Sequence, residues 1–155
     1  MNAFMKLAWE RAKETMNQNV GGPFGATITN EKGEAIAVAS NSVLRDCDPT
    51  AHAEINAIRE ACRQLNTYDL SGCTLYTTAY PCPMCLSAII WAKIKAVYYG
   101  CTAEDAEAIG FRDEAIYRYI EDNCQDENQL TLHAMDREEC QQLFEEYQEK
   151  NKVIY

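Results

Sequence analysis

The residues most able to do chemistry in this sequence are one histidine and two cysteines. Cys82 and Cys85 stand three positions apart, and Pro83 between them is typical of the first residue of a helix. Both thiols would then lie in a first helical turn, where the helix dipole and a bound metal favour thiolates. With His52 upstream they offer three ligands and leave a fourth position for water, which is the pattern of a catalytic zinc site.

Glu54 is the candidate proton carrier beside this site. It follows His52 by two positions, so on a regular helix the two side chains would point to different sides. If the zinc lies beyond the end of the helix, Glu54 can still take a proton from water and return it to a substrate, as general acid and base catalysis requires. The alternative is a carboxylate that is favoured at a helix N-terminus by the dipole alone.

A Cys-x-x-Cys pair alone is as typical of a redox pair, or of half a structural zinc site, as it is of a catalytic zinc site. A structural site needs a fourth ligand at similar spacing, and the other cysteines form no second pair. We interpret these others as free thiols that fill the core: Cys47, Cys62, Cys73, Cys101, Cys124 and Cys140. His52 alone, like His133, would more often be an ordinary helix histidine, so the zinc prediction depends on the joint motif.

Composition predicts one soluble globular domain. The chain has 155 residues, of which 47% are hydrophobic and 25% charged. Its net charge of -10 would repel a polyphosphate, so we expect no nucleic-acid partner. Residues 1–20 carry charges within their apolar pattern, no run is long enough to span a membrane, and the cysteine spacing suits a reducing compartment. We therefore predict a cytoplasmic protein that makes no membrane contact.

Periodicity places the motifs on an alternation of helices and strands. Residues 3–18 read as an amphipathic helix, and residues 24–29 and 34–39 as a hairpin around the turn at 30–33. Thr50 is the expected N-cap of the next helix, which puts His52 and Glu54 in its first turn. The buried stripe of that helix is expected at Ile55, Ile58, Ala61, Cys62 and Leu65.

The second half of the pattern favours parallel strand pairing. A strand at 73–78 leads into the helix that starts at Pro83, which is apolar almost all round and is expected to be buried, and a strand at 96–100 follows. Further along, we expect a helix at 114–122, a last strand at 130–134 and a last helix at 138–150.

Four segments together resemble the cytidine deaminase superfamily and, within it, the bacterial guanine deaminases: residues 22–26, Asn41, residues 48–54 and residues 81–86. The joint pattern His-x-Glu and Pro-Cys-x-x-Cys is the known signature of zinc-dependent nucleobase deaminases. Residues 91–92, residues 107–113 and Tyr155 point more weakly to the guanine branch. The resemblance implies an α/β fold, a cytidine-deaminase-like three-layer α/β/α sandwich around a mixed sheet of about five strands. It covers residues 1–155 as a single zinc-dependent deaminase domain, with 151–155 a C-terminal tail.

Carried over position by position, the resemblance implies a role for eight residues. His52, Cys82 and Cys85 would hold one zinc per subunit, and Glu54 would shuttle protons. Phe24 would stack on the purine, Asn41 and Asp113 would hydrogen-bond its edge, and Tyr155 would cross to the other subunit of a homodimer and close a site there by segment exchange. Each of the last four has a plain alternative, which is core packing for Phe24, a strand-end turn for Asn41, a helix cap for Asp113 and a frayed end for Tyr155.

The implied function is hydrolytic deamination of guanine, a small-molecule nucleobase, to xanthine and ammonia. The alternatives are a deaminase of another small base or nucleoside (cytosine, cytidine, guanosine or a triazine), a deaminase of tRNA adenosine, and a non-catalytic zinc-stabilised interaction domain. Two positions depart from the family pattern and bear on substrate choice. Tyr80 stands where many relatives have a glutamate, and Arg112 stands where the guanine branch has a second acid.

Overall fold

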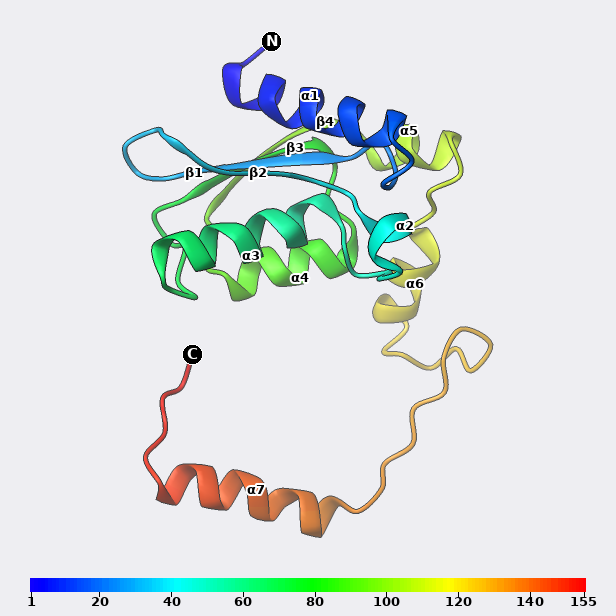
Figure 1. Cartoon of the computed structure of the whole chain (residues 1–155). Helices are drawn as coiled ribbons and strands as arrows, with labels where there is room; N and C mark the ends of the chain where they lie inside the picture. The colour runs from blue at the N-terminus through cyan, green and yellow to red at the C-terminus, as the bar shows by residue number, and fades with distance from the viewer. The chain divides into compact units, whose positions relative to one another are not determined.

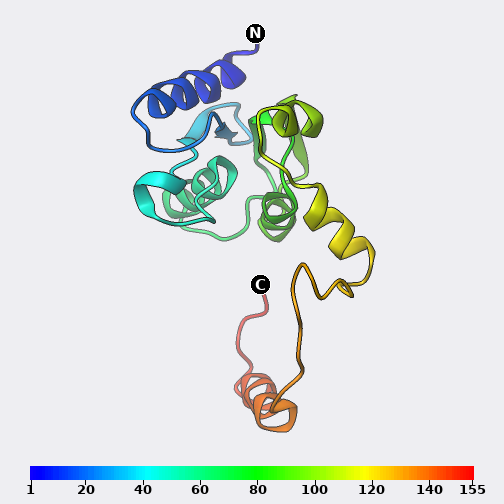
Figure 2. The ribbon, with the colours of Figure 1, turned by 90° about the vertical axis from the view of Figure 1, so that its right-hand side faces the viewer.

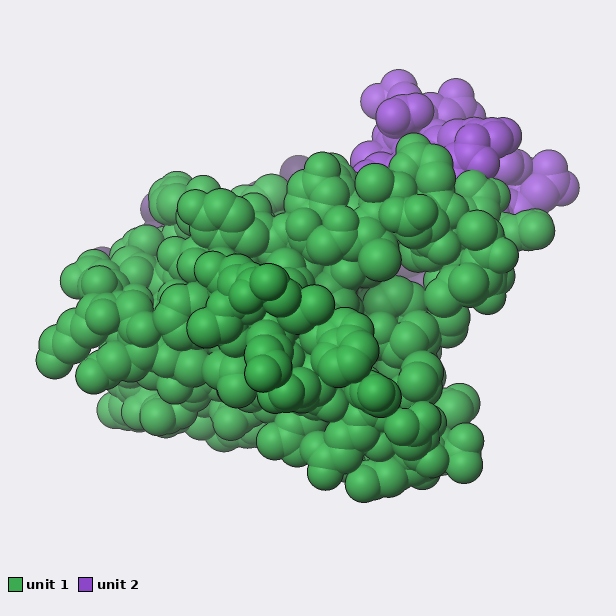
Figure 3. Space-filling model, turned by 90° about the horizontal axis from the view of Figure 1, so that it is seen from above, with its two compact units in different colours: residues 1–113 green, residues 114–155 purple.

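The computed structural model describes residues 1–155, which form two compact units, 1–113 and 114–155 (Figure 3). The first unit contains α1 (Ala3–Asn17), β1 (Gly25–Thr29), β2 (Ala35–Ser40), α2 (Val43–Asp46), α3 (Ala53–Leu65), β3 (Thr74–Ala79), α4 (Pro83–Trp91), β4 (Ala96–Cys101) and α5 (Ala103–Ala108). The second contains α6 (Glu114–Glu121) and α7 (Arg137–Glu149). None of the helices has both the length and the apolar character needed to cross a membrane.

One mixed sheet of four strands organises the first unit, in the order β2-β1-β3-β4. The predicted hairpin is confirmed, because β1 pairs antiparallel with β2 from Gly25↔Ser40 to Thr29↔Ala35. β1 also pairs antiparallel with β3, whereas β3 and β4 are parallel and are joined by α4. Parallel neighbours need such a crossover, and this strand-helix-strand unit confirms the predicted parallel pairing.

Helices cover both faces of this sheet and make three layers, as predicted (Figures 1 and 2). α1 lies on one face, where Gly25 is required because a Cβ there would meet the carbonyl oxygen of Ala8 at 2.0 Å. α3 and α4 lie side by side on the other face. Ile28 and Leu75 are fully buried in the core between the sheet and α3 and α4.

Three expectations about the elements are wrong. Leu65, expected in the buried stripe of α3, is 41% exposed. The sheet has four strands and not about five, because residues 130–134 form no strand. The alternation there is only five residues long, and so short a segment forms a strand only where a sheet edge pairs with it. α4 is also not buried all round, since Ile90 is 73% exposed and Trp91 is 71% exposed. Its packed side carries Cys85 and Ile89, and no other element of the first unit packs on the opposite side.

Candidate active site

The N-termini of α3 and α4 bring the metal-binding residues together. His52 is the N-cap of α3 with extended backbone angles, φ -71° and ψ 157°, and Cys82 is the N-cap of α4, with φ -65° and ψ 167°. Pro83 occupies the first position of α4, as predicted, and Cys85 lies in its first turn. The expected cap at Thr50 is wrong, because Thr50 instead donates its backbone N–H and its hydroxyl to the Asp48 side chain.

The N-cap position of His52 explains how His52 and Glu54, only two positions apart, can serve the same site. The two side chains would diverge on a regular helix, but His52 lies just outside α3 in an extended conformation, whereas Glu54 is in its first turn. Both can therefore reach one point beyond the helix end, where two sets of unpaired backbone N–H groups also favour negative charge.

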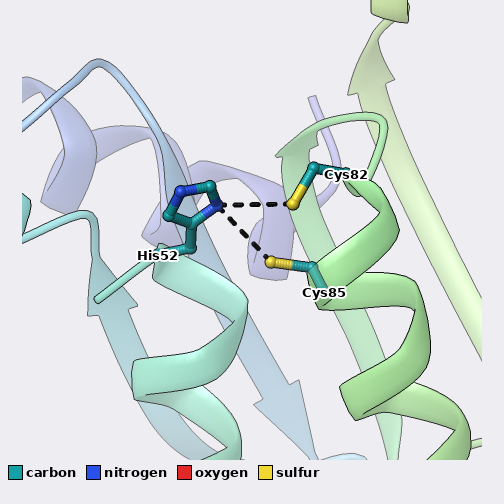
Figure 4. A group of neighbouring side chains, drawn as sticks. All are labelled: His52, Cys82 and Cys85. Carbon is teal, nitrogen blue, oxygen red and sulfur yellow. Dashed lines mark hydrogen bonds between the residues drawn. The ribbon is translucent and has the colours of Figure 1, made fainter. Parts of the chain in front are cut away.

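The three donor atoms fit a tetrahedral metal ion. His52 Nδ1 lies 3.5 Å from Cys82 Sγ and 3.6 Å from Cys85 Sγ, and all three donor atoms lie within 4.8 Å of one another (Figure 4). With Zn–S of about 2.3 Å, Zn–N of about 2.0 Å and a tetrahedral angle, the N–S separation comes to about 3.5 Å. One imidazole and two thiols are also the donor set that zinc prefers.

The hydrogen bonds among these residues already favour a thiolate. Hydrogen bonds from the Cys85 thiol and from the His52 ring lower the pKa of Cys82. The same contact with Cys82 raises the pKa of His52, and the hydrogen bond to Cys82 together with burial raises that of Cys85. A metal that replaces these protons meets a site already arranged around negative sulfur.

Glu54 is the buried carboxylate beside the three donors. It is 6% exposed, and burial raises its pKa. Its Oε1 accepts a hydrogen bond from the Thr77 hydroxyl at 3.2 Å, and its Oε2 lies 3.5 Å from Cys85 Sγ. A carboxylate with a raised pKa that is fixed beside a metal position is suited to accept and then return a proton.

A cavity of about 320 Å³ opens at this centre. Its lining includes His52, Glu54 and Cys82, together with Phe24 and Asn41. It also includes Tyr80, Phe111 and Asp113. The volume suits a single small ligand, and the mostly apolar wall with a few polar groups is typical of small-molecule sites. Of the four residues expected to touch a purine, the structure therefore brings Phe24, Asn41 and Asp113 to one cavity.

Asn41 presents a hydrogen-bond donor to this cavity. It is buried, and its Oδ1 accepts hydrogen bonds from the backbone N–H of Gly22 and of Val43, both at 3.2 Å. Because the oxygen is held by two N–H groups, the amide orientation is fixed, and Nδ2 makes no hydrogen bond within the protein. Asn41 is thus more than a turn residue, since its two N–H donors are available to an acceptor on a ligand.

An aromatic pair forms another part of the wall. Phe24 and Phe111 meet edge to face with ring centroids 4.8 Å apart. Gly22 permits this packing, because a Cβ there would lie 3.0 Å from the Phe24 ring and 3.2 Å from Phe111. Phe111 therefore fixes the orientation of the Phe24 ring. Phe111 was not selected from the sequence, although it lies in the segment 107–113.

The other predicted positions have different surroundings. Asp113 is partly buried, and burial raises the pKa of its carboxyl group. Tyr80 lines the cavity and packs edge to face on Tyr99, with ring centroids 5.1 Å apart. Arg112 does not line the cavity and lies 4.0 Å from a Glu107 oxygen. Tyr155 belongs to the second unit, and its role over an active site stays a prediction.

Thr77 is the second residue that sequence reasoning missed. It is 1% exposed on β3 and donates its hydroxyl to Glu54. A threonine within a strand gives no signal as a pattern, because threonine is common in strands. Only the three-dimensional contact identifies it as the residue that orients the Glu54 carboxylate.

Comparison with known proteins gives one family and several relatives. The family described as "Cytidine and deoxycytidylate deaminase zinc-binding region" matches residues 1–101. The guanine deaminase of Bacillus subtilis (strain 168) is 50% identical over 118 residues, which cover 76% of this chain and 75% of that protein. An X-ray structure of guanine deaminase from Bacillus subtilis has a TM-score of 0.92 at 43% identity and covers 100% of this chain and 99% of that chain. The tRNA-specific adenosine deaminase of Aquifex aeolicus (strain VF5) is 48% identical over 96 residues, 62% of this chain and 62% of that protein.

Proposed function

Because the chain belongs to the cytidine and deoxycytidylate deaminase family, we propose that it is a zinc-dependent aminohydrolase that converts guanine to xanthine and ammonia. The observation that carries this proposal is the single cavity where a buried carboxylate and the His52, Cys82 and Cys85 donors meet an amide donor and an aromatic wall. Full-length similarity to a guanine deaminase structure supports guanine as the base.

In the proposed mechanism, His52, Cys82 and Cys85 hold zinc and Glu54 moves the protons. The zinc supplies a Lewis acid that lowers the pKa of water, so that a nucleophile is available at neutral pH. Glu54 takes a proton from the attacking water and delivers it to a ring nitrogen beside the amino-bearing carbon. The carbon–nitrogen bond then breaks, and the amino group leaves as ammonia after receiving a second proton through Glu54.

Asn41 and Asp113 are proposed to select the base. Guanine carries carbonyl and ring-nitrogen acceptors on one edge, which match the free Nδ2 donors of Asn41. Its ring N–H and amino groups are adjacent donors, which suit a carboxylate such as Asp113. Phe24, held by Phe111, would stack on the ring. A base that lacks these partners leaves buried polar groups unpaired, which costs binding free energy.

Asp113→Asn is expected to lower kcat/KM for guanine by about 10- to 100-fold, because it replaces a charged acceptor with a neutral amide. Steady-state kinetics with guanine measure the effect. The matched control is the neighbouring Arg112→Ala, which alters an exposed side chain outside the cavity and is expected to change kcat/KM by less than about twofold. Equal losses in the two variants would mean that Asp113 does not read the base.

Thr77→Val is expected to lower kcat about fivefold with little change in KM, because it removes the hydrogen bond that orients Glu54 but keeps the side-chain volume. Thr77→Ser keeps the hydroxyl and should restore most of kcat. Thr27→Val is the control on the adjacent strand, since the buried Thr27 hydroxyl has no hydrogen-bond partner. Thr27→Val should leave kcat unchanged and raise Tm. If Thr77→Val also left kcat unchanged, Thr77 would have no role in the mechanism.

The second candidate function is deamination of tRNA adenosine. It is favoured by the 48% identity to a tRNA-specific adenosine deaminase and opposed by the net charge of -10. Ammonia release from the zinc-loaded protein should be compared for guanine, guanosine, cytosine, cytidine, adenine, a triazine and adenosine-containing tRNA. We expect the fastest ammonia release with guanine. Ammonia release from another compound and none from guanine would overturn the proposed substrate.

The exposed side of α4 and the C-terminal tail bear on how the protein assembles. We propose a homodimer, supported by the exposed Ile90 and Trp91 on α4, in which residues 151–155 with Tyr155 cover a site. Apolar side chains of this size are more often found in interfaces than in water. Because guanine is an intracellular metabolite, the proposed location is the cytoplasm. A truncation that ends at Lys150 tests the covering role, since unchanged kinetics would exclude it.

A further inference from the structure

A second cavity, of about 410 Å³, lies at the β2 edge of the sheet. β2 is an edge strand, with α1 on one face of the sheet and α3 on the other (Figure 2). The cavity is lined by residues of all three elements and of α2. Its polar lining includes Ser40, Ser42 and Asn56, and its volume is in the range of small-molecule sites.

This cavity gathers most of the arginines of the first unit. Arg11, Arg45, Arg59 and Arg63 line it, against only two acids, Asp46 and Glu60, so the lining carries four positive and two negative charges. The whole chain, by contrast, has a net charge of -10. The first unit contains only one other arginine, Arg112. Four arginines from three helices therefore meet at one cavity of an acidic protein, where their guanidinium groups can receive an anion.

The acids nearby leave most guanidinium donors available. Arg11 lies 3.7 Å from Glu14, and Arg59 lies 3.8 Å from Asp48, separations longer than a hydrogen bond. The Arg63 side chain makes no ion pair or hydrogen bond. Only Arg45 is closely held, at 2.7 Å from Asp46. Each guanidinium presents five N–H donors in a planar fork that matches the oxygens of a phosphate.

The cavity is separate from the substrate cavity although the two share one segment. Successive side chains of an extended segment point to opposite sides. Ser40 and Ser42 line the arginine cavity, whereas Asn41 between them lines the substrate cavity. Asn56 fixes this wall by donating to the Ser40 carbonyl and the Ser42 hydroxyl, both at 2.9 Å. A ligand in one cavity should therefore bind without displacing a ligand in the other.

We propose that the arginine cavity binds a small phosphate-bearing ligand, either free phosphate or a sugar or nucleoside monophosphate. A phosphate dianion would bridge Arg59 and Arg63 on α3 with Arg11 on α1. The cavity volume suits a single small molecule, and the acidic protein around it disfavours a long polyanion. Because the arginines are exposed, binding should weaken as salt is raised.

The test is calorimetric titration of the full-length zinc-loaded protein with inorganic phosphate, ribose 5-phosphate and uridine 5′-monophosphate, with ribose as the phosphate-free control. We expect saturable binding of one phosphate compound per chain and none of ribose; the tightest of the three identifies the source of the phosphate. The double variant Arg59→Gln/Arg63→Gln should weaken binding at least about tenfold. Arg137→Gln on α7 removes the same kind of charge elsewhere and should not change it.

Glu60→Gln gives a result in the opposite direction, since it removes an acid from the lining and should tighten phosphate binding severalfold. Circular dichroism and Tm confirm that each variant is folded. Binding that persists in the double variant but disappears when zinc is removed would place the anion at the metal and overturn the proposal. The phosphate site is also excluded if no compound saturates, or if an RNA stem-loop binds at this surface and phosphate does not.

Discussion

Glu54→Gln is expected to lower kcat by about 10²- to 10⁴-fold while the protein keeps its zinc. Glutamine has nearly the same shape and can still accept the hydrogen bond from Thr77, but it cannot take a proton from water. The carboxylate is buried beside the three donors. The other acid of the cavity, Asp113, is proposed to bind the edge of the base and not to move protons. Ammonia release with guanine measures kcat, and elemental analysis measures zinc per chain.

The control for Glu54→Gln is Glu60→Gln on the same helix, α3. Glu60 lies outside the substrate cavity, so its replacement should leave kcat within about twofold in phosphate-free buffer. If Glu54→Gln turned over guanine at the wild-type rate with full zinc content, the proton-carrying role of Glu54 would be excluded.

Cys85→Ser is expected to abolish zinc retention, because a buried thiolate ligand is replaced by a hydroxyl that zinc binds poorly. Activity should fall by at least about 10³-fold as a result. Zinc binds the folded state and not the unfolded chain, so it stabilises the protein, and its loss should also lower Tm by about 10 °C. Zinc analysis after gel filtration, activity and calorimetric Tm measure the three effects.

Cys140→Ser is the matched cysteine control, since Cys140 is exposed on α7 in the second unit. The expectation that Cys140, Cys47 and Cys101 fill the core is wrong, because all three are exposed. It should keep zinc, activity and Tm. In the wild type, chelation should remove activity and added Zn²⁺ should restore it, whereas Cys85→Ser should not recover. A Cys85→Ser protein that held one zinc and remained active would show that Cys85 is not a ligand.

The sequence predicted α1, α3, α4 and the four strands of the first unit because each carries a local signal, whereas the short helices α2 and α5 were not predicted. Gly33 with φ +75° permits the hairpin turn, and Pro83 begins α4. The first helix ends at Asn17, with Gln18 as its C-cap, before the Gly21–Gly22 pair that was expected to break it. The metal donors were found because their types and spacing are restricted by zinc chemistry. The start of α3 was placed wrongly, since Thr50 was chosen as its N-cap and the N-cap is His52.

Other features depend on packing between distant segments, which local patterns do not encode. The Thr77–Glu54 hydrogen bond joins β3 to α3, and the Phe24–Phe111 contact joins segments far apart in the chain. The exposed Ile90 and Trp91 were expected to be buried, because an apolar helix reads the same whether its outer side faces a core or an interface. The arginine cavity has no sequence motif, because its residues come from three separate helices.

Guanine deamination by a zinc enzyme can be tested by competition between two substrates in one reaction. Zinc-loaded protein is incubated with equal concentrations of guanine and an adenosine-containing tRNA anticodon stem-loop, and xanthine and inosine are measured together with ammonia. We expect xanthine and ammonia in equal amounts and no inosine. Inosine without xanthine, or no product from guanine at full zinc content, would contradict the proposed function.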